Sequence, residues 1–102
     1  MSPLRVRKYV SDQSDFEKII EIYEQDRDGR PLFLFNVTMQ NHSGYDQDFD
    51  NLDMPISIEE KCDDPELKRY LNLIHHSDTA LKSLIEHFSK QKDPTVIVFF
   101  GD

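Results

Sequence analysis

Apolar side chains along the chain fall into four stretches, which predict two helices and two strands. The first stretch has the spacing of one helix face, with its apolar positions at Phe16, Ile19, Ile20 and Tyr23. Ser11 and Asp12 precede it and offer side chains for an N-cap. Ser14 and Glu17 have the spacing of a capping box. Gly29 suits a left-handed turn after the helix, so we expect an amphipathic helix that ends before it.

A longer stretch with helical spacing covers residues 65–91. Asp64 is a typical N-cap residue, Pro65 suits the first helical position, and Asp93–Pro94 stops the helix. The apolar positions mark one face: Leu67, Tyr70, Leu71, Ile74, Leu81, Leu84, Ile85 and Phe88. A helix of this length spans about 40 Å. Asp78 falls on the same face, where we expect a structural acid bonded to a neighbouring loop.

Two short runs, residues 31–37 and 95–100, are continuously apolar instead of alternating. This composition is typical of a strand that is covered on both faces. The prediction places four phenylalanines in the core: Phe33, Phe35, Phe99 and Phe100. Strand, long helix and strand form a βαβ unit with a right-handed crossover. We therefore predict an α/β fold with two buried parallel strands and a long crossover helix.

Residues 43–64 are predicted to be an acidic surface excursion, with a short strand at 56–58. Three alternating acids resemble the start of an EF-hand calcium loop: Asp46, Asp48 and Asp50. That loop requires glycine at its sixth position and glutamate at its twelfth, where this chain has Asn51 and Ser57. A solvated acidic loop is the better interpretation.

Length, charge and cysteine content limit the class of protein. The 102 residues carry a net charge of −8, with no basic cluster, so we expect no nucleic-acid partner. The single cysteine, Cys62, excludes an internal disulfide and a metal site built from cysteines. The apolar runs fall short of the roughly 20 residues of a membrane helix, so we expect a soluble segment without membrane contact. Two buried strands need more cover than two helices provide, so residues 1–102 are predicted to be a single partial domain.

Polar groups follow both predicted strands, where ligands bind in open α/β sheets. His42 lies in the polar stretch after the first strand, and Gly101–Asp102 follows the second. A histidine can bond a phosphate oxygen or ligate a metal, and an aspartate is a hard ligand for a divalent ion. Spacing alone favours a simpler interpretation, an exposed loop histidine and a capping acid.

Residues 33–45, FLFNVTMQNHSGY, resemble a segment of bacterial lipoteichoic acid synthase-like proteins. These proteins form the phosphoglycerol transferase branch of the sulfatase and alkaline phosphatase superfamily. The C-terminal part of the chain is similar to the last catalytic strand of that family, where a histidine follows the Gly-Asp. This similarity is carried by residues 70–74, Ser77–Asp78 and residues 95–102. The resemblance covers nearly the whole chain apart from the acidic excursion.

The resemblance implies an alkaline phosphatase/sulfatase-like sheet and a metal-dependent enzyme with a covalent threonine intermediate. The implied metal is manganese, with magnesium or zinc as alternatives, and the implied ligand in this chain is Asp102. His42 and Asn41 would bind the phosphate of the substrate. The nucleophilic threonine and an acidic ligand lie upstream in the family, and this chain has no match for them. We therefore expect no catalytic residue, no activity and no specific manganese binding in this chain alone.

Three functional hypotheses follow. The first is a fragment of a phosphoglycerol or phosphoethanolamine transferase that acts on cell-envelope polymers, with a glycerophosphate-bearing lipid or glycan as substrate. Its longer parent would be extracytoplasmic and anchored in the membrane. The second is a sulfatase or phosphodiesterase parent. The third is a non-catalytic small α/β protein that forms a homodimer.

Overall fold

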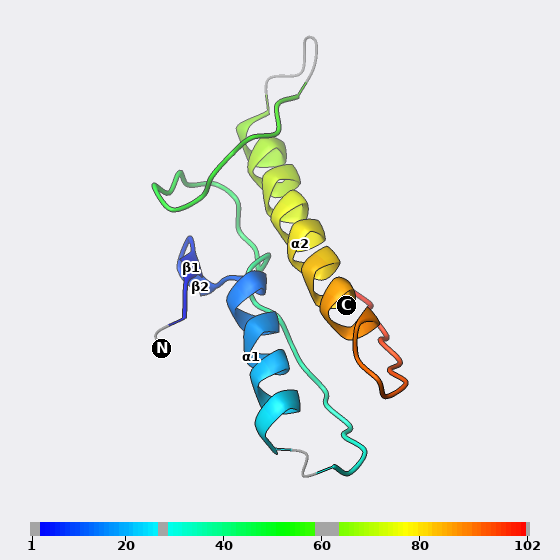
Figure 1. The fold of residues 1–102 in the computed structure, drawn as a ribbon. Helices are drawn as coiled ribbons and strands as arrows, with labels where there is room; N and C mark the ends of the chain where they lie inside the picture. Colours follow the sequence, from blue (N-terminus) through cyan, green and yellow to red (C-terminus); the bar gives the residue numbers. More distant parts are fainter. Residues whose placement is uncertain (1–2, 27–28, 59–63, 102) are drawn as a thin grey trace.

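The computed structural model describes residues 3–26, 29–58 and 64–101 and consists of two helices and a small hairpin. Helix α1 (Asp12–Asp26) lies against the longer helix α2 (Pro65–Ser89), as Figure 1 shows. Strands β1 (Arg5–Val6) and β2 (Tyr9–Val10) form an antiparallel pair directly before α1. In this pair Arg5 lies opposite Val10 and Val6 opposite Tyr9. One long connection, which includes the apolar residues 31–37, joins α1 to α2.

Helix α1 begins and ends where the sequence predicts. The backbone N–H of Ser14 donates to the Ser11 hydroxyl at 3.1 Å, so Ser11 is the N-cap. Gly29 follows the helix with a φ of 75°, the left-handed conformation that glycine adopts without steric cost. The predicted capping box is wrong, because the Ser14 hydroxyl instead accepts a hydrogen bond from the N–H of Leu4 at 2.9 Å. The serine therefore holds the N-terminal segment against α1.

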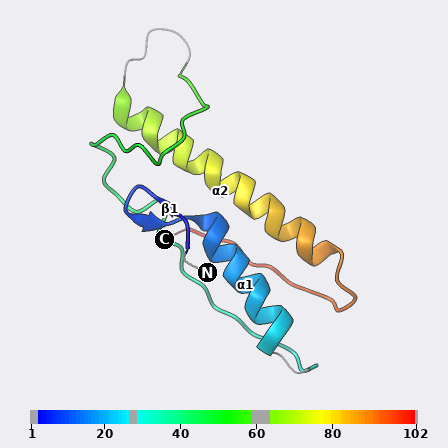
Figure 2. The same cartoon turned by 60° about the vertical axis from the view of Figure 1, so that its left-hand side comes forward.

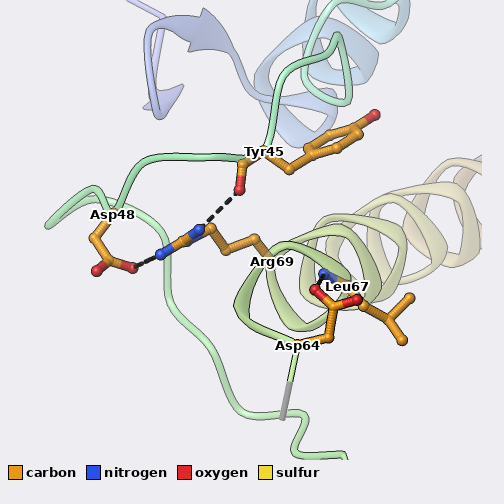
Figure 3. A network of polar contacts seen from close by, with 5 residues as sticks. All are labelled: Tyr45, Asp48, Asp64, Leu67 and Arg69. Atoms are coloured by element: carbon orange, nitrogen blue, oxygen red, sulfur yellow. Dashed lines mark hydrogen bonds and ion pairs between the residues drawn. The ribbon is translucent and has the colours of Figure 1, made fainter. Parts of the chain in front are cut away.

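Helix α2 also begins as predicted. The Asp64 carboxylate accepts a hydrogen bond from the N–H of Leu67 at 3.2 Å, and Pro65 follows at the first helical position (Figure 3). The helix ends at Ser89, within two residues of the predicted end. Among the described residues, no helix combines the length and apolarity that are needed to cross a lipid bilayer.

The core lies between the two helices and is small. Phe16 from α1 packs with Ala80 and Leu84 from α2, and each is at most 6% exposed. The small side chain of Ala80 lets the helices approach each other. Around these three residues pack four partly buried side chains: Ile19, Ile20, Leu81 and Phe88. This contact fixes how α1 and α2 lie together.

The predicted pair of buried parallel strands is wrong for this structure. Residues 31–37 and 95–100 form no strand, and Figure 2 shows both as irregular trace. The predicted core phenylalanines are exposed by 61–91%: Phe33, Phe35, Phe99 and Phe100. An extended segment becomes a buried strand when a neighbour accepts and donates its backbone hydrogen bonds. In the described part of the chain, no such neighbour is paired with either segment, so their side chains stay in solvent.

The buried face of α2 also differs from the predicted apolar face. The buried positions of α2 are Arg69, Asn72, Leu73, Ser77, Ala80 and Leu84. Much of the predicted face is 37–49% exposed: Leu67, Tyr70, Leu71, Ile74 and Ile85. Asp78 is exposed as well and is not the buried structural acid that its spacing predicts. A face with two polar side chains, Asn72 and Ser77, and the arginine Arg69 can be buried because the loops supply hydrogen-bond partners for them.

Two buried side chains of α2 hold the acidic excursion against the helix. The Arg69 guanidinium donates to the carbonyl of Tyr45 at 2.8 Å and pairs with the Asp48 carboxylate, also at 2.8 Å (Figure 3). Asn72, fully buried, donates to the carbonyl of Ile56 at 2.9 Å and accepts from its N–H at 2.8 Å. The predicted short strand at 56–58 does not form, because the amide of Asn72 satisfies the backbone that a neighbouring strand would otherwise pair.

Candidate functional site

The loop Thr38–Tyr45 lies where the N-terminal hairpin, the start of α1 and the middle of α2 meet. Gln40, 1% exposed, fixes this loop to both helices. Its side-chain oxygen accepts from the N–H of Asp12 at 2.9 Å. Its side-chain nitrogen donates to the carbonyl of Leu73 at 3.1 Å. One side chain therefore satisfies a donor at the N-terminus of α1 and an acceptor in α2.

Ser77 is the centre of a buried polar network beside Gln40. Its hydroxyl donates to the carboxylate of Asp12 and accepts from the side-chain amides of Gln40 at 3.2 Å and Asn41 at 2.7 Å. The side-chain oxygen of Asn41 accepts from Gln40 at 3.0 Å. The carboxamide of Asn41 is thus bonded within the protein at both ends.

Asp12 is a buried carboxyl with an unusual environment. It is 3% exposed, and its Oδ1 atom has no hydrogen-bond partner among the described residues. Burial raises the pKa of Asp12 above its ordinary value of 3.8, the hydrogen bond from Ser77 lowers it, and the charge of Asp15 raises it further. The net direction is upward, so folding favours the protonated form of this group.

The raised pKa of Asp12 predicts a specific pH dependence of stability. Above pH 3.8 the unfolded chain loses this proton before the folded protein does, so the free energy of unfolding falls as pH rises through the folded pKa. Asp12→Asn removes the titrating group. We expect the stability of Asp12→Asn relative to wild type to increase from pH 4 to 7, by at most about 1.4 kcal/mol per pH unit. Urea unfolding at several pH values tests this, with the exposed Asp50→Asn as the control, and a difference that is constant with pH would contradict it.

Arg7 lies at the centre of the loop. Its guanidinium donates to the carbonyls of Gln40 at 2.8 Å, His42 at 2.6 Å and Gly44 at 2.7 Å. The residue is 6% exposed, and the rings of Tyr9 and Tyr45 each have their centroid 5.4 Å from its Cζ atom. Three carbonyl groups of the loop therefore surround the buried, positively charged guanidinium of Arg7.

His42 is the exposed residue of this loop that carries acid–base chemistry. Its Nδ1 atom lies 2.6 Å from the carbonyl of Ser43 and 3.2 Å from the hydroxyl of Tyr9. A carbonyl oxygen accepts but does not donate, so Nδ1 carries a proton. The contacts of the imidazole within the described residues use Nδ1 and the ring face against Tyr9, at a centroid distance of 5.3 Å. This leaves Nε2 as the atom for a ligand.

The residues that the sequence nominated have different surroundings. Asn41 and His42 are neighbours, but Asn41 is half-buried in the network of Ser77 whereas His42 is exposed. Asp102, the predicted metal ligand, lies outside the described residues, as does Cys62. Sequence reasoning missed Arg7 and Gln40, which hold the loop. In the part of the chain with described structure, no group of three or more histidine, cysteine, aspartate or glutamate side chains could hold a metal ion.

Comparison with known proteins identifies relatives of this chain. The family model described as "Sulfatase" matches residues 2–102. A candidate cyclic beta-1,2-glucan modification protein of Rhizobium meliloti (strain 1021) is 31% identical over 99 residues, which cover 92% of this chain and 15% of that protein. The capsular polysaccharide biosynthesis protein RkpI of the same strain is 30% identical over 101 residues, which cover 98% of this chain and 17% of that protein. The chain thus spans about one sixth of the length of these curated relatives. No solved structure matches.

Proposed function

The chain belongs to the sulfatase family, and we propose that its loop Thr38–Tyr45 binds the anionic group of the substrate of a larger catalytic domain. The observation that carries the proposal is the imidazole of His42, exposed and fixed through Nδ1 so that Nε2 is left for a ligand. A protonated imidazole donates a charge-assisted hydrogen bond to an oxygen of phosphate or sulfate. The chain carries a net charge of −8, so the protein as a whole repels an anion, and the attraction has to come from the positive charge of the imidazole itself.

The transferred group that we favour is phosphoglycerol or phosphoethanolamine, and the acceptor class is a cell-envelope polymer. The resemblance of residues 33–45 to lipoteichoic acid synthase-like proteins supports the group. The names of the two relatives, for glucan modification and for capsular polysaccharide biosynthesis, support the acceptor class. The proposal includes an extracytoplasmic location for the longer protein, because such polymers lie on that side of the membrane.

The role of each residue in the proposed site differs. With protons on both ring nitrogens, His42 would donate from Nε2 to a non-bridging oxygen and neutralise part of its charge. Tyr9 holds the ring face, and Lys8, whose Nζ lies 5.5 Å from the Tyr9 ring centroid, adds a positive charge nearby. Asn41 would act on the substrate through its backbone or through the shape of the loop, because its carboxamide is bonded to Ser77 and Gln40.

The family resemblance also implies a divalent metal ion. The described residues do not fit such an ion, because no group of three or more potential ligands is brought together among them. Asp102 as a metal ligand therefore stays a prediction, and no step of the proposed binding is assigned to a metal.

Titration of the 102-residue chain with glycerol phosphate tests the role of His42. We expect saturable NMR shift changes at the His42 and Tyr9 rings, and binding about tenfold weaker or worse in His42→Ala, the loss for one hydrogen bond to a charged group. His75→Ala, on α2, is the matched control and should bind as wild type does. Equal affinity of wild type and His42→Ala would contradict the proposal. A parallel titration with inorganic sulfate compares the two anion classes, and tighter binding of sulfate would favour a sulfatase parent.

A further inference from the structure

We propose that Arg7 is a positioning residue for His42, an inference that rests on the proposed role of the loop Thr38–Tyr45 in binding an anion. Arg7 does not reach a substrate, because it is 6% exposed. It acts through the backbone of the loop, and its guanidinium sets where the imidazole of His42 is presented.

The hydrogen bonds of Arg7 converge on alternate residues of the loop. One terminal nitrogen, Nη2, donates to the carbonyls of Gln40 and His42, and the other, Nη1, donates to the carbonyl of Gly44. The planar fork of a guanidinium can hold several acceptors in fixed directions, which the single head of a lysine cannot. The shortest of the three bonds, at 2.6 Å, is to the carbonyl of His42 itself. A shift of Arg7 therefore moves the backbone that carries the imidazole.

Two tyrosine side chains provide a second set of contacts between the Arg7 guanidinium and the site. Tyr9, whose ring is 5.4 Å from the guanidinium carbon, also places its hydroxyl 3.2 Å from Nδ1 of His42. Tyr45, at the same distance from the guanidinium, donates from its hydroxyl to the carbonyl of Asn41 at 2.6 Å. Arg7 thus contacts both the backbone of the loop and the aromatic side chains that hold its two nominated residues.

The backbone of Arg7 indicates that the side chain is needed. Its φ is 57°, in the left-handed region that glycine and asparagine occupy most easily. Asn51 stabilises this conformation, since its side chain accepts from the N–H of Arg7 at 2.9 Å and donates to its carbonyl at 2.7 Å. A turn with such support would accept glycine without strain. The arginine at this position is explained by its contacts with the loop.

The variant Arg7→Gly tests the inference with little disturbance of the turn. In the 102-residue chain we expect the His42 imidazole resonances to shift and broaden, while those of Ala80 and Leu84 in the helix core stay unchanged. We expect the affinity for glycerol phosphate to fall about tenfold, the lower end of what removing a supporting hydrogen-bond partner costs at metal sites. Guanidinium chloride should restore part of both signals, whereas sodium chloride at equal ionic strength should not.

Two further variants complete the design. Arg5→Gln removes an exposed guanidinium that donates to the carbonyl of Lys8, and it should leave the imidazole signals and the affinity as in wild type. Arg7→Lys keeps the charge but lacks the fork, so it should resemble Arg7→Gly more than wild type.

Three results would overturn the positioning role of Arg7 or distinguish it from the proposed anion binding. Unchanged His42 resonances and affinity in Arg7→Gly would overturn the positioning role. Equal changes at His42 and at the core residues Ala80 and Leu84, without rescue by guanidinium, would also overturn it, because Arg7 would then support the fold in general. If wild type fails to bind glycerol phosphate but Arg7→Gly still shifts the imidazole, the proposed function fails and the positioning role of Arg7 stands.

Discussion

Replacement of Gln40 by glutamate is expected to lower the free energy of unfolding at neutral pH by about 3–5 kcal/mol, the range for an uncompensated buried charge. The substitution preserves shape but turns the amide nitrogen into a carboxylate oxygen. In the wild-type protein this amide nitrogen donates to the carbonyl of Leu73 and to the Ser77 hydroxyl. A carboxylate has no proton to give to a carbonyl, and Asp12 next to it is another acid.

Urea unfolding of Gln40→Glu at pH 7 and at pH 4 tests this expectation. Burial raises the pKa of a carboxyl at this position above the unfolded value of about 4.3, so stability is lost as pH rises through the folded pKa. The deficit relative to wild type should therefore be smaller at pH 4. Gln47→Glu makes the same change of charge at an exposed position and is the matched control. A similar deficit in both variants would show that Gln40 is not buried in solution.

Truncation of Phe16 to alanine is expected to cost about 3–5 kcal/mol, the usual range for a buried phenylalanine. The ring of Phe16 is 6% exposed and fills the contact between α1 and the Ala80–Leu84 segment of α2. Domains of this size are stable by about 5–15 kcal/mol in total, so this loss removes a large share. Thermal and urea unfolding should show a lower midpoint and a larger unfolded fraction at 25 °C.

Phe33→Ala is the control for Phe16→Ala because it removes the same ring from a position that is 91% exposed. We expect its effect to stay within about 0.5 kcal/mol. Equal destabilisation by the two substitutions would mean that residues 31–37 pack against the helices in solution. The pair of variants therefore tests which phenylalanines form the core.

The helices were predictable from the sequence because their signals are local. Ser11 and Asp64 provide caps within three residues of the N–H groups that they satisfy, and Gly29 supplies the left-handed turn after α1. The strands at 31–37 and 95–100 were not correctly predicted, because a strand depends on a neighbour that its own residues do not specify. Their composition indicates strands, and the described residues offer them no partner.

The candidate site was predictable in part. His42 was nominated by its place after the predicted strand 31–37, which does not form, and by the family resemblance of residues 33–45. Its role as a phosphate-binding residue remains a prediction. Nothing local marks Arg7 or Gln40. Apart from the bond between Gln40 and Asn41, the hydrogen bonds of their side chains reach residues 28 to 37 positions away in the chain. The buried face of α2 did leave a signal. Small and polar residues at helical spacing, such as Ser77 and Ala80, indicate a helix face that packs closely against backbone and loops. The larger apolar residues on the other face led to the prediction that the other face is buried.

The exposure of residues 95–100 has a consequence for the behaviour of the chain at high concentration. Val96 is 89% and Phe100 68% exposed, and the run from Val96 to Phe100 contains no charge, proline or glycine. Segments of this composition stack between molecules into the dry interfaces of cross-β fibrils. Residues 32–35 are a second apolar run, and the unpaired backbone of such extended segments is a template for pairing with another chain. Because the folded chain leaves these segments exposed, the yield of unassociated protein depends on the rate of intermolecular association, and so on concentration, more than on the stability of the fold.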